Sequence, residues 1–152
     1  MKNKYLENMV RAIDGIMTTD VKFKYALAKN RKALLNELEV LNEVSNPSAE
    51  FIAYDIERIE LAKKMADKDE KGNAKIEGNA YVFTDQKEFD KELTKLRLKH
   101  KKVLEARDKQ IKEFIDLLDK DSDFTPFKIK LENTPKEVSA AQLSGIIDLI
   151  QE

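Results

Sequence analysis

Cationic side chains gather in one short segment near the start of the chain. Residues 22–32 carry five lysine or arginine side chains and no acidic one. The segment begins a predicted helix, and backbone N–H groups at a helix start also favour anions. Asn30 falls near the apolar face of that helix, where a polar residue needs a partner or sets a register. We expect an anionic, nucleotide-like ligand here, and the alternative is a solvated basic face packed against acidic segments of the same fold. The candidate ligand-binding residues of this segment are Lys22, Lys24, Tyr25, Lys29, Asn30 and Arg31.

A second cationic stretch, residues 95–112, lies within a predicted long helix. Arg97 and His100 of this stretch complete the set of candidate ligand-binding residues. A cationic stripe can follow a phosphate backbone. This one lacks interleaved aromatic residues for base stacking and contains no nucleic-acid-binding motif, so we expect no nucleic-acid partner. His100 falls on or beside the apolar stripe, and its alternative role is that of a packed, hydrogen-bonded neighbour.

The residue patterns of common enzymes and metal sites are missing. The sequence contains no glycine-rich phosphate loop, no nucleophile elbow and no histidine pair for a metal. With no cysteine and one histidine, a zinc site has nothing to build on. The acidic turn at residues 67–73 lacks the later ligands of a calcium loop. We predict that the chain is not an enzyme and that it has no catalytic residue, metal or other cofactor.

Length and composition fit one folded, helix-rich domain over residues 1–152. Charged residues make up 38% of the chain, but hydrophobic residues make up 41% and recur at helical spacing, which disordered segments lack. A net charge of −1 gives no general attraction to nucleic acid or to an anionic membrane. No apolar run approaches the roughly 20 residues that span a bilayer, and the N-terminus lacks a signal-peptide core. We expect a cytoplasmic protein with no membrane partner.

Helices dominate the expected fold. Apolar residues at intervals of three, four and seven predict one long helix over residues 85–119, which needs partners along its length. Thr84 and Asp85 compete as its N-cap. Residues 4–66 are also helical by pattern, with a polar break after the first helix and a proline after the second. A single kinked helix over residues 21–66 is the alternative.

Short strands complete the expected fold. Glycine and asparagine turns frame residues 73–83, which predicts a β-hairpin. Residues 127–132 alternate apolar and charged side chains as a half-buried strand does. Ser139 favours the start of a C-terminal helix over residues 140–151. The expected fold class is therefore α+β and predominantly helical, a long antiparallel helical hairpin or bundle with a small β-sheet at one end.

Several of these features occur together in a recognisable order. An Ala-Lys-Asn core at residues 28–30 is followed by a long Leu/Glu-rich helix and an acidic turn at residues 70–73. A helix start at residues 89–93 and a final strand and helix ending at Ile150 come next. This layout resembles a family of small uncharacterised proteins encoded by tailed phages and prophages of Gram-positive bacteria. The family carries no established activity, so the resemblance assigns no site residues, and it implies a location in the host-cell cytoplasm.

These observations lead to two expectations about function. The first is a non-enzymatic, oligomeric binding protein that captures a host protein or a small anionic ligand; a phage origin would make this a means of countering host defence. The alternative is a structural or assembly role in a phage, as a morphogenesis chaperone or scaffold-like protein. That role would use exposed apolar helix faces such as Leu35, Val40 and Leu98. A homo-oligomer is expected because the long helix presents apolar surface that one chain cannot cover.

Overall fold

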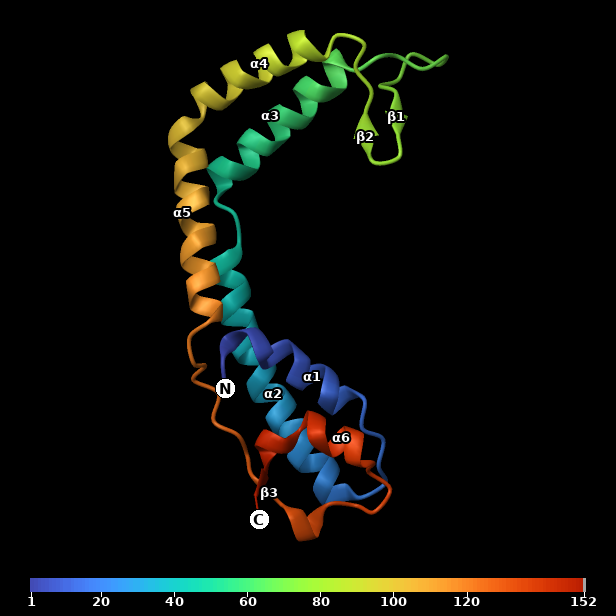
Figure 1. The fold of residues 1–152 in the computed structure, drawn as a ribbon, viewed down its shortest axis with the longest axis vertical. Coiled ribbons are helices and arrows are strands. Elements are labelled where there is room, and N and C mark those ends of the chain that lie inside the picture. The colour runs from blue at the N-terminus through green and yellow to red at the C-terminus, as the bar shows by residue number, and fades with distance from the viewer. Residues whose placement is uncertain (152) are drawn as a thin grey trace. The chain divides into compact units, whose positions relative to one another are not determined.

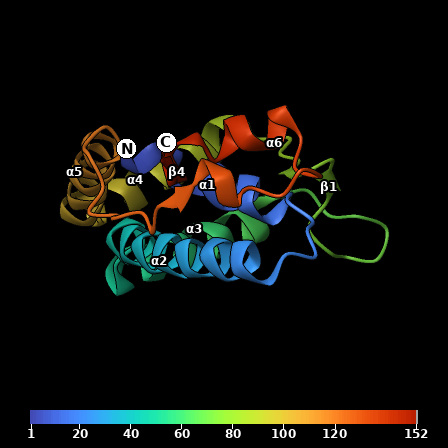
Figure 2. The ribbon, with the colours of Figure 1, turned by 90° about the horizontal axis from the view of Figure 1, so that it is seen from below.

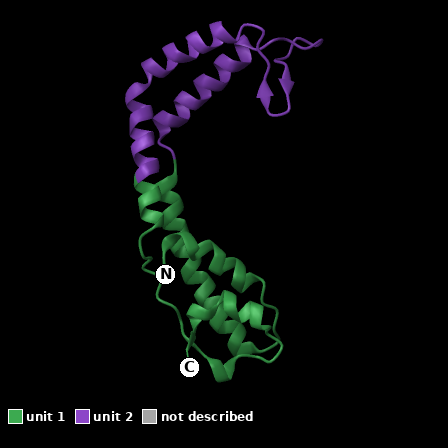
Figure 3. Cartoon of the chain, viewed as in Figure 1, with its two compact units in different colours: residues 1–46, 113–152 green, residues 47–112 purple. Residues whose placement is uncertain are grey.

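The structure, a computed structural model, describes residues 1–151 and shows a predominantly helical α+β fold (Figure 1). The chain divides into two compact units, whereas the sequence predicted one domain (Figure 3). Unit 1 contains residues 1–46 and 113–152, and unit 2 contains residues 47–112. In the described residues the strands form two separate pairs, one in each unit, rather than one small sheet.

Three helices frame unit 1. A short 3-10 helix, η1 (Asn3–Tyr5), leads into α1 (Leu6–Asp14), which packs against both α2 (Val21–Ser45) and α6 (Ala140–Gly145) (Figure 2). Asp20 caps α2, because its carboxylate accepts a hydrogen bond from the N–H of Phe23 at 2.7 Å. The approach of α6 to α1 depends on Gly145, where a Cβ atom would lie 3.0 Å from the Cβ of Ala12.

The C-terminal part of unit 1 corrects two predictions. The strand expected over residues 127–132 shortens to β3 (Ile129–Lys130), followed by the 3-10 helix η2 (Leu131–Asn133). The helix expected over residues 140–151 ends at Gly145, and the chain continues through η3 (Ile147–Leu149) into β4 (Ile150–Gln151). β4 pairs in parallel with β3. The residues that were expected to form the last helical turns pair with β3 or are buried instead. Ile146 and Leu149 are both 0% exposed.

The core of unit 1 brings together segments from both ends of the chain. Its largest buried side chains come from α1, α2 and the C-terminal segment: Leu6, Phe23, Leu34, Ile146 and Leu149. Phe114, Leu117 and Leu118, at the end of α5 (Lys101–Leu118), pack against this cluster. Apolar side chains at helical spacing therefore face this core, as amphipathic helices require.

Unit 2 is built on α3 (Ala49–Met65) and α4 (Gln86–Lys99), which pack against each other. Ser48 caps α3 by accepting a hydrogen bond from the N–H of Phe51 at 3.2 Å. Residues 21–66 therefore form two helices and not one kinked helix. Asp85, rather than Thr84, caps α4, because its carboxylate accepts from the N–H of Glu88 at 3.0 Å.

A β-hairpin connects α3 to α4, as predicted for residues 73–83. β1 (Ile76–Glu77) and β2 (Ala80–Tyr81) pair antiparallel, with Ile76 opposite Tyr81. Gly78 in the turn has φ +62°, a backbone conformation that glycine adopts at little cost.

The prediction of one continuous helix over residues 85–119 is wrong. α4 ends at Lys99 and α5 begins at Lys101, with His100 between them at φ −103° and ψ 19°. The break contains neither proline nor glycine, so no local signal marks it. Instead, the His100 ring lies 5.4 Å from the ring of Tyr54, and its Nε2 lies 3.2 Å from a carboxylate oxygen of Glu57. Contacts with α3 therefore hold the residue at which the helix bends.

Candidate functional site

An apolar groove in unit 1 lies between the first turns of α2 and the segment that contains β3. We call it the α2 groove. Its volume of about 560 Å³ falls in the range of roughly 300–1,000 Å³ that is typical of small-molecule sites. Phe23, Ala26 and Ile129 form its buried side, each no more than 6% exposed. The other lining residues are Val21, Lys22, Tyr25, Phe127, Lys128, Lys130, Asn133 and Gln151.

Phe127 forms one wall of the α2 groove and is held through both its backbone and its ring. The Nδ2 of Asn30 donates to the Phe127 carbonyl at 2.8 Å, and the Phe127 N–H donates to the Asn30 Oδ1 at 2.8 Å. The same Nδ2 also donates to the Ala26 carbonyl at 3.0 Å. The Phe127 ring meets Tyr25 edge to face with centroids 6.4 Å apart, and the Lys29 Nζ lies 4.2 Å from its centroid. This wall is therefore in place before a ligand arrives, which lowers the entropic cost of binding.

The charged side chains that line the α2 groove are all cationic. Lys22 lies on α2, Lys128 and Lys130 lie on the opposite side, and none of the described lining residues is acidic. The Lys128 Nζ donates to the backbone carbonyl of Asp148 at 2.8 Å, and the Lys130 Nζ lies 3.6 Å from a carboxylate oxygen of Glu132. An anionic group that entered the groove would meet cations on both sides and no carboxylate in the lining.

The structure separates the predicted ligand-binding residues of α2 by role. Lys22 and Tyr25 line the groove. Lys29 and Asn30 do not line it but support its Phe127 wall from behind. Asn30 is 1% exposed, and its position on the apolar face predicted that it needs a partner. It has partners, because its side-chain amide donates to two backbone carbonyls. Lys24 is exposed and lies outside the groove lining.

Arg31 has a structural partner. Its Nε lies 2.6 Å and its Nη2 3.2 Å from the two carboxylate oxygens of Asp14 in α1. The hydrogen bond from Arg31 holds the pKa of the Asp14 carboxyl below its ordinary value, and the Asp14 carboxylate raises the pKa of the Arg31 guanidinium. This two-point ion pair joins α1 to α2. Arg31 therefore fits the alternative prediction, in which the basic face packs against an acidic segment, better than it fits a contact with a ligand.

Arg97 and His100 belong to unit 2 and are not among the residues that line the α2 groove. Arg97 is exposed on α4. His100, with its side chain 15% exposed, packs against Tyr54 and Glu57. Hydrogen bonds from Lys99 and then from His100 lower the pKa of the Glu57 carboxyl. His100 therefore has the role of a packed neighbour.

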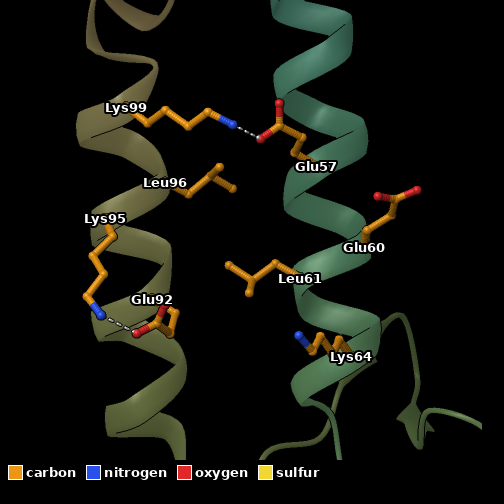
Figure 4. A pocket seen from close by; sticks show the side chains of 8 residues that line it. All are labelled: Glu57, Glu60, Leu61, Lys64, Glu92, Lys95, Leu96 and Lys99. Atoms are coloured by element: carbon orange, nitrogen blue, oxygen red, sulfur yellow. Dashed lines mark hydrogen bonds and ion pairs between the residues drawn. The ribbon is translucent and has the colours of Figure 1, made fainter.

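A second hollow, of about 430 Å³, lies between α3 and α4 in unit 2 (Figure 4). Leu61 and Leu96 point toward each other across it, and Glu57 pairs with Lys99 at 2.8 Å. The remaining lining side chains are Glu60, Lys64, Glu92 and Lys95. Acidic and cationic residues are equal in number here, so the hollow selects neither sign of ligand. Its cross-helix ion pair serves to hold α3 against α4.

The acidic turn after α3 satisfies its carboxylates internally. Asp69 accepts hydrogen bonds from the N–H groups of Lys71 at 2.9 Å and Asn73 at 2.8 Å. The bond from the Asn73 N–H is the main cause of an Asp69 pKa below its ordinary value, and the bond from Lys71 lowers this pKa further. Over residues 1–151, no group of histidine, cysteine or acidic side chains is arranged to hold a metal ion.

Sequence reasoning missed the half of the α2 groove that follows α5. Phe127, Lys128 and Lys130 sit in the alternating segment that was recognised as a strand, but the alternation gave no sign that its cationic positions line a groove. Asn133 and Gln151 carry no local signal at all. The two halves of the groove lie about a hundred residues apart in the sequence, and only the tertiary fold brings them together.

Comparison of the chain with protein-family models, curated proteins and solved structures gives no match. None of the described helices combines the length and the apolar content that crossing a bilayer requires.

Proposed function

We propose that this chain is a non-catalytic binding protein that captures an anionic ligand with an apolar body in the α2 groove. One observation carries the proposal: the groove has a buried apolar side and three lining lysines, and none of its lining residues within residues 1–151 is acidic. In a chain with 29 acidic residues, an acid-free lining of this size favours an anion. Ligand sites commonly combine an apolar lining with a few polar groups that orient the ligand.

The same lining supports binding rather than catalysis. Among its described residues there is no histidine, aspartate or glutamate to pair with Tyr25 or with a lysine as a catalytic acid–base group. The histidine of the chain packs against Tyr54 and Glu57 in unit 2. Lysine ammonium groups attract an anion, and the Tyr25 and Phe127 rings offer apolar surface to the rest of a ligand.

The proposal is tested with 1-anilinonaphthalene-8-sulfonate, a fluorescent aromatic anion. Lys22 and Lys24 offer a matched pair, because both are exposed lysines near the start of α2 and only Lys22 lines the groove. Lys22→Glu is expected to weaken the Kd of the dye about tenfold, which corresponds to ~1.4 kcal/mol. Lys24→Glu is expected to leave it unchanged. Equal effects of the two substitutions would refute the proposal.

Amide chemical shifts give an independent readout. On titration with the dye, the largest changes in a ¹H–¹⁵N correlation spectrum are expected at residues 21–26 and 127–130, on the two sides of the groove. Shift changes confined to the hollow between α3 and α4 would place the site elsewhere and contradict the proposal.

A second candidate function is assembly through exposed apolar helix faces. Leu35 and Val40 on α2 are 38% and 58% exposed, and Leu98 on α4 is 68% exposed, so each unit by itself presents apolar helix surface to a partner chain or to a second copy of this one. We propose self-association as the simplest form of this role. Sedimentation velocity should give a mass above that of one chain, and Val40→Lys should reduce it. A monomer at all micromolar concentrations would refute self-association. A phage origin and a host target remain predictions from the sequence pattern, and the groove proposal does not depend on them.

A further inference from the structure

We infer that the ligand of the α2 groove is a small apolar molecule with a single carboxylate head group. This inference rests on the proposed binding function and narrows it to one chemical class. It follows from the contacts that the nearby lysines already make, from the neutral donors that line the groove, and from the fixed aromatic wall.

Most cations at the groove already have partners. The Lys128 Nζ donates to the Asp148 carbonyl at 2.8 Å, and the Lys130 Nζ lies 3.6 Å from Glu132. Lys29 lies over the Phe127 ring at 4.2 Å. Among the described residues, Lys22 has neither an ion pair nor a side-chain hydrogen bond. Lys22 is therefore the lining lysine whose three N–H donors are all available, whereas Lys128, bonded to a neutral carbonyl, and Lys130, in an exposed ion pair, are engaged in part and keep their charge.

The lining lysines come without the clustered or bidentate donors of phosphate sites, which suits a head group with one negative charge. A phosphate monoester carries a charge of about −1.5 to −2 near pH 7 and three strongly accepting oxygens. Its binding sites supply several charge-assisted donors, typically from arginine or from a glycine-rich loop. The groove lining contains no arginine and no glycine. A carboxylate has a single charge and two oxygens, which Lys22 and a neutral donor can satisfy together.

Neutral donors are present in the same lining. Asn133 and Gln151 both line the groove, and neither side chain forms a hydrogen bond with another described residue. A primary amide donates two hydrogen bonds and adds no charge. The groove therefore offers two exposed amide side chains beside its lysines.

The rest of the groove fits an apolar body. Phe23, Ala26 and Ile129 are buried beneath it, whereas the rings of Tyr25 and Phe127 are still 64% and 40% exposed. Covering exposed ring surface is favourable by roughly 25 cal/mol per Å². The Phe127 wall is held in place by Asn30, so an acyl chain or a ring can cover these surfaces without first ordering the wall.

A matched series of probes with one body and three head groups tests this inference. Octanoate, octanol and octyl phosphate are titrated into the full-length ¹⁵N-labelled chain, with AMP as a nucleotide probe. Octanoate is expected to shift the amides of residues 21–26 and 127–130 and to bind at least about tenfold more tightly than octanol, or ~1.4 kcal/mol. Octyl phosphate and AMP are expected to bind no more tightly than octanoate.

Substitutions assign the preference to the named residue. Lys22→Gln is expected to remove the tenfold advantage of octanoate over octanol, and the control Lys24→Gln is expected to keep it. Tighter binding of octyl phosphate or AMP than of octanoate would overturn the inference and leave anion binding intact. Equal binding of octanol and octanoate would overturn it as well. If N-acetyl-Ala-Phe, a dipeptide with a free C-terminal carboxylate, bound tenfold more tightly than octanoate, the ligand would be a peptide C-terminus instead. If neither the dye nor any probe shifts the groove amides, the proposed function itself fails.

Discussion

The side-chain amide of Asn30 forms hydrogen bonds with both backbone polar groups of Phe127, 97 positions further along the chain. An asparagine presents one donor and one acceptor in the same arrangement as a peptide unit, so Asn30 pairs with Phe127 much as a neighbouring strand would. This contact joins α2 to the segment before β3. It therefore defines both the core of unit 1 and the wall of the α2 groove.

Replacing Asn30 should destabilise the chain more than any surface change on α2. Asn30→Ala leaves the N–H and the carbonyl of Phe127 without their partner, and an unsatisfied buried polar group costs about 1–3 kcal/mol. Urea titration should show a loss of about 2 kcal/mol in the free energy of unfolding. The control is Asn36→Ala, an exposed asparagine of the same helix, for which the change should stay within about 0.5 kcal/mol. Equal losses would show that Asn30 contributes nothing specific.

Gly145 and Ala12 should be energetically coupled. A Cβ at position 145 would lie 3.0 Å from the Ala12 Cβ, so Gly145→Ala forces α6 away from α1 at a cost of about 1 kcal/mol. In an Ala12→Gly background the same substitution has no atom to collide with. A double-mutant cycle should therefore give a coupling energy of at least about 0.5 kcal/mol.

Gly15→Ala serves as the control for that cycle. A Cβ at position 15 would meet only backbone oxygens at 3.5 and 3.6 Å, which is ordinary van der Waals contact. It should cost nothing in the same assay. Strict additivity between positions 12 and 145 would show that the two helices separate freely.

Asp67 should make stability depend on pH in the acid range. Its carboxylate accepts hydrogen bonds from the N–H and the hydroxyl of Thr84, both at 2.9 Å. The bond from the Thr84 backbone is the main cause of an Asp67 pKa below the ordinary value of 3.8. Because the folded pKa is depressed, the contribution is fully present above pH 3.8 and is lost as the pH falls through the lower folded value.

Unfolding free energies measured from pH 6 down to about pH 2, well below the ordinary carboxyl pKa, check this sign. Asp67→Asn should be less stable than the parent chain near pH 6, and the difference should shrink as the pH falls. Asp123→Asn, at an exposed aspartate, should show no such convergence. A difference that stays constant with pH would rule out the carboxylate as its source.

His100 should affect stability, and neither Arg97 nor His100 should affect dye binding. His100→Ala removes the ring that contacts Tyr54 and approaches Glu57, and a loss of about 1 kcal/mol is expected. Neither residue lines the α2 groove, so Arg97→Ala and His100→Ala should both leave the dye Kd unchanged. A tenfold change in either variant would mean that the site extends beyond the groove described here.

The contrast between helix ends and helix bends shows what the sequence can reveal. Ser139 caps the helix whose start it favoured, and Asp85, one of two candidate residues, caps α4, because an N-cap acts on the backbone within three residues. The bend at His100 was missed, because the contacts that hold it come from α3 and the apolar stripe runs through it without interruption. Local chemistry can be predicted from the sequence, whereas contacts between distant segments cannot.

The same distinction applies to the candidate site. The cationic segment near the start of α2 was recognised, and two of its members, Lys22 and Tyr25, line the groove. The pairing of Arg31 with Asp14 was not predicted, because the two residues belong to different helices. The opposite wall around Phe127 was recognised only as a strand. A groove whose halves are so far apart in sequence becomes visible only in the folded chain.

Unit 1 is assembled from two stretches of sequence with all of unit 2 between them. During synthesis, residues 47–112 leave the ribosome as one continuous piece, and chains tend to fold unit by unit as they emerge. Phe127 and Ile129, which meet Asn30 and Phe23 in the folded unit, are made only after the whole of unit 2. Until they emerge, the part of the groove that lies on α2 is without its C-terminal partners.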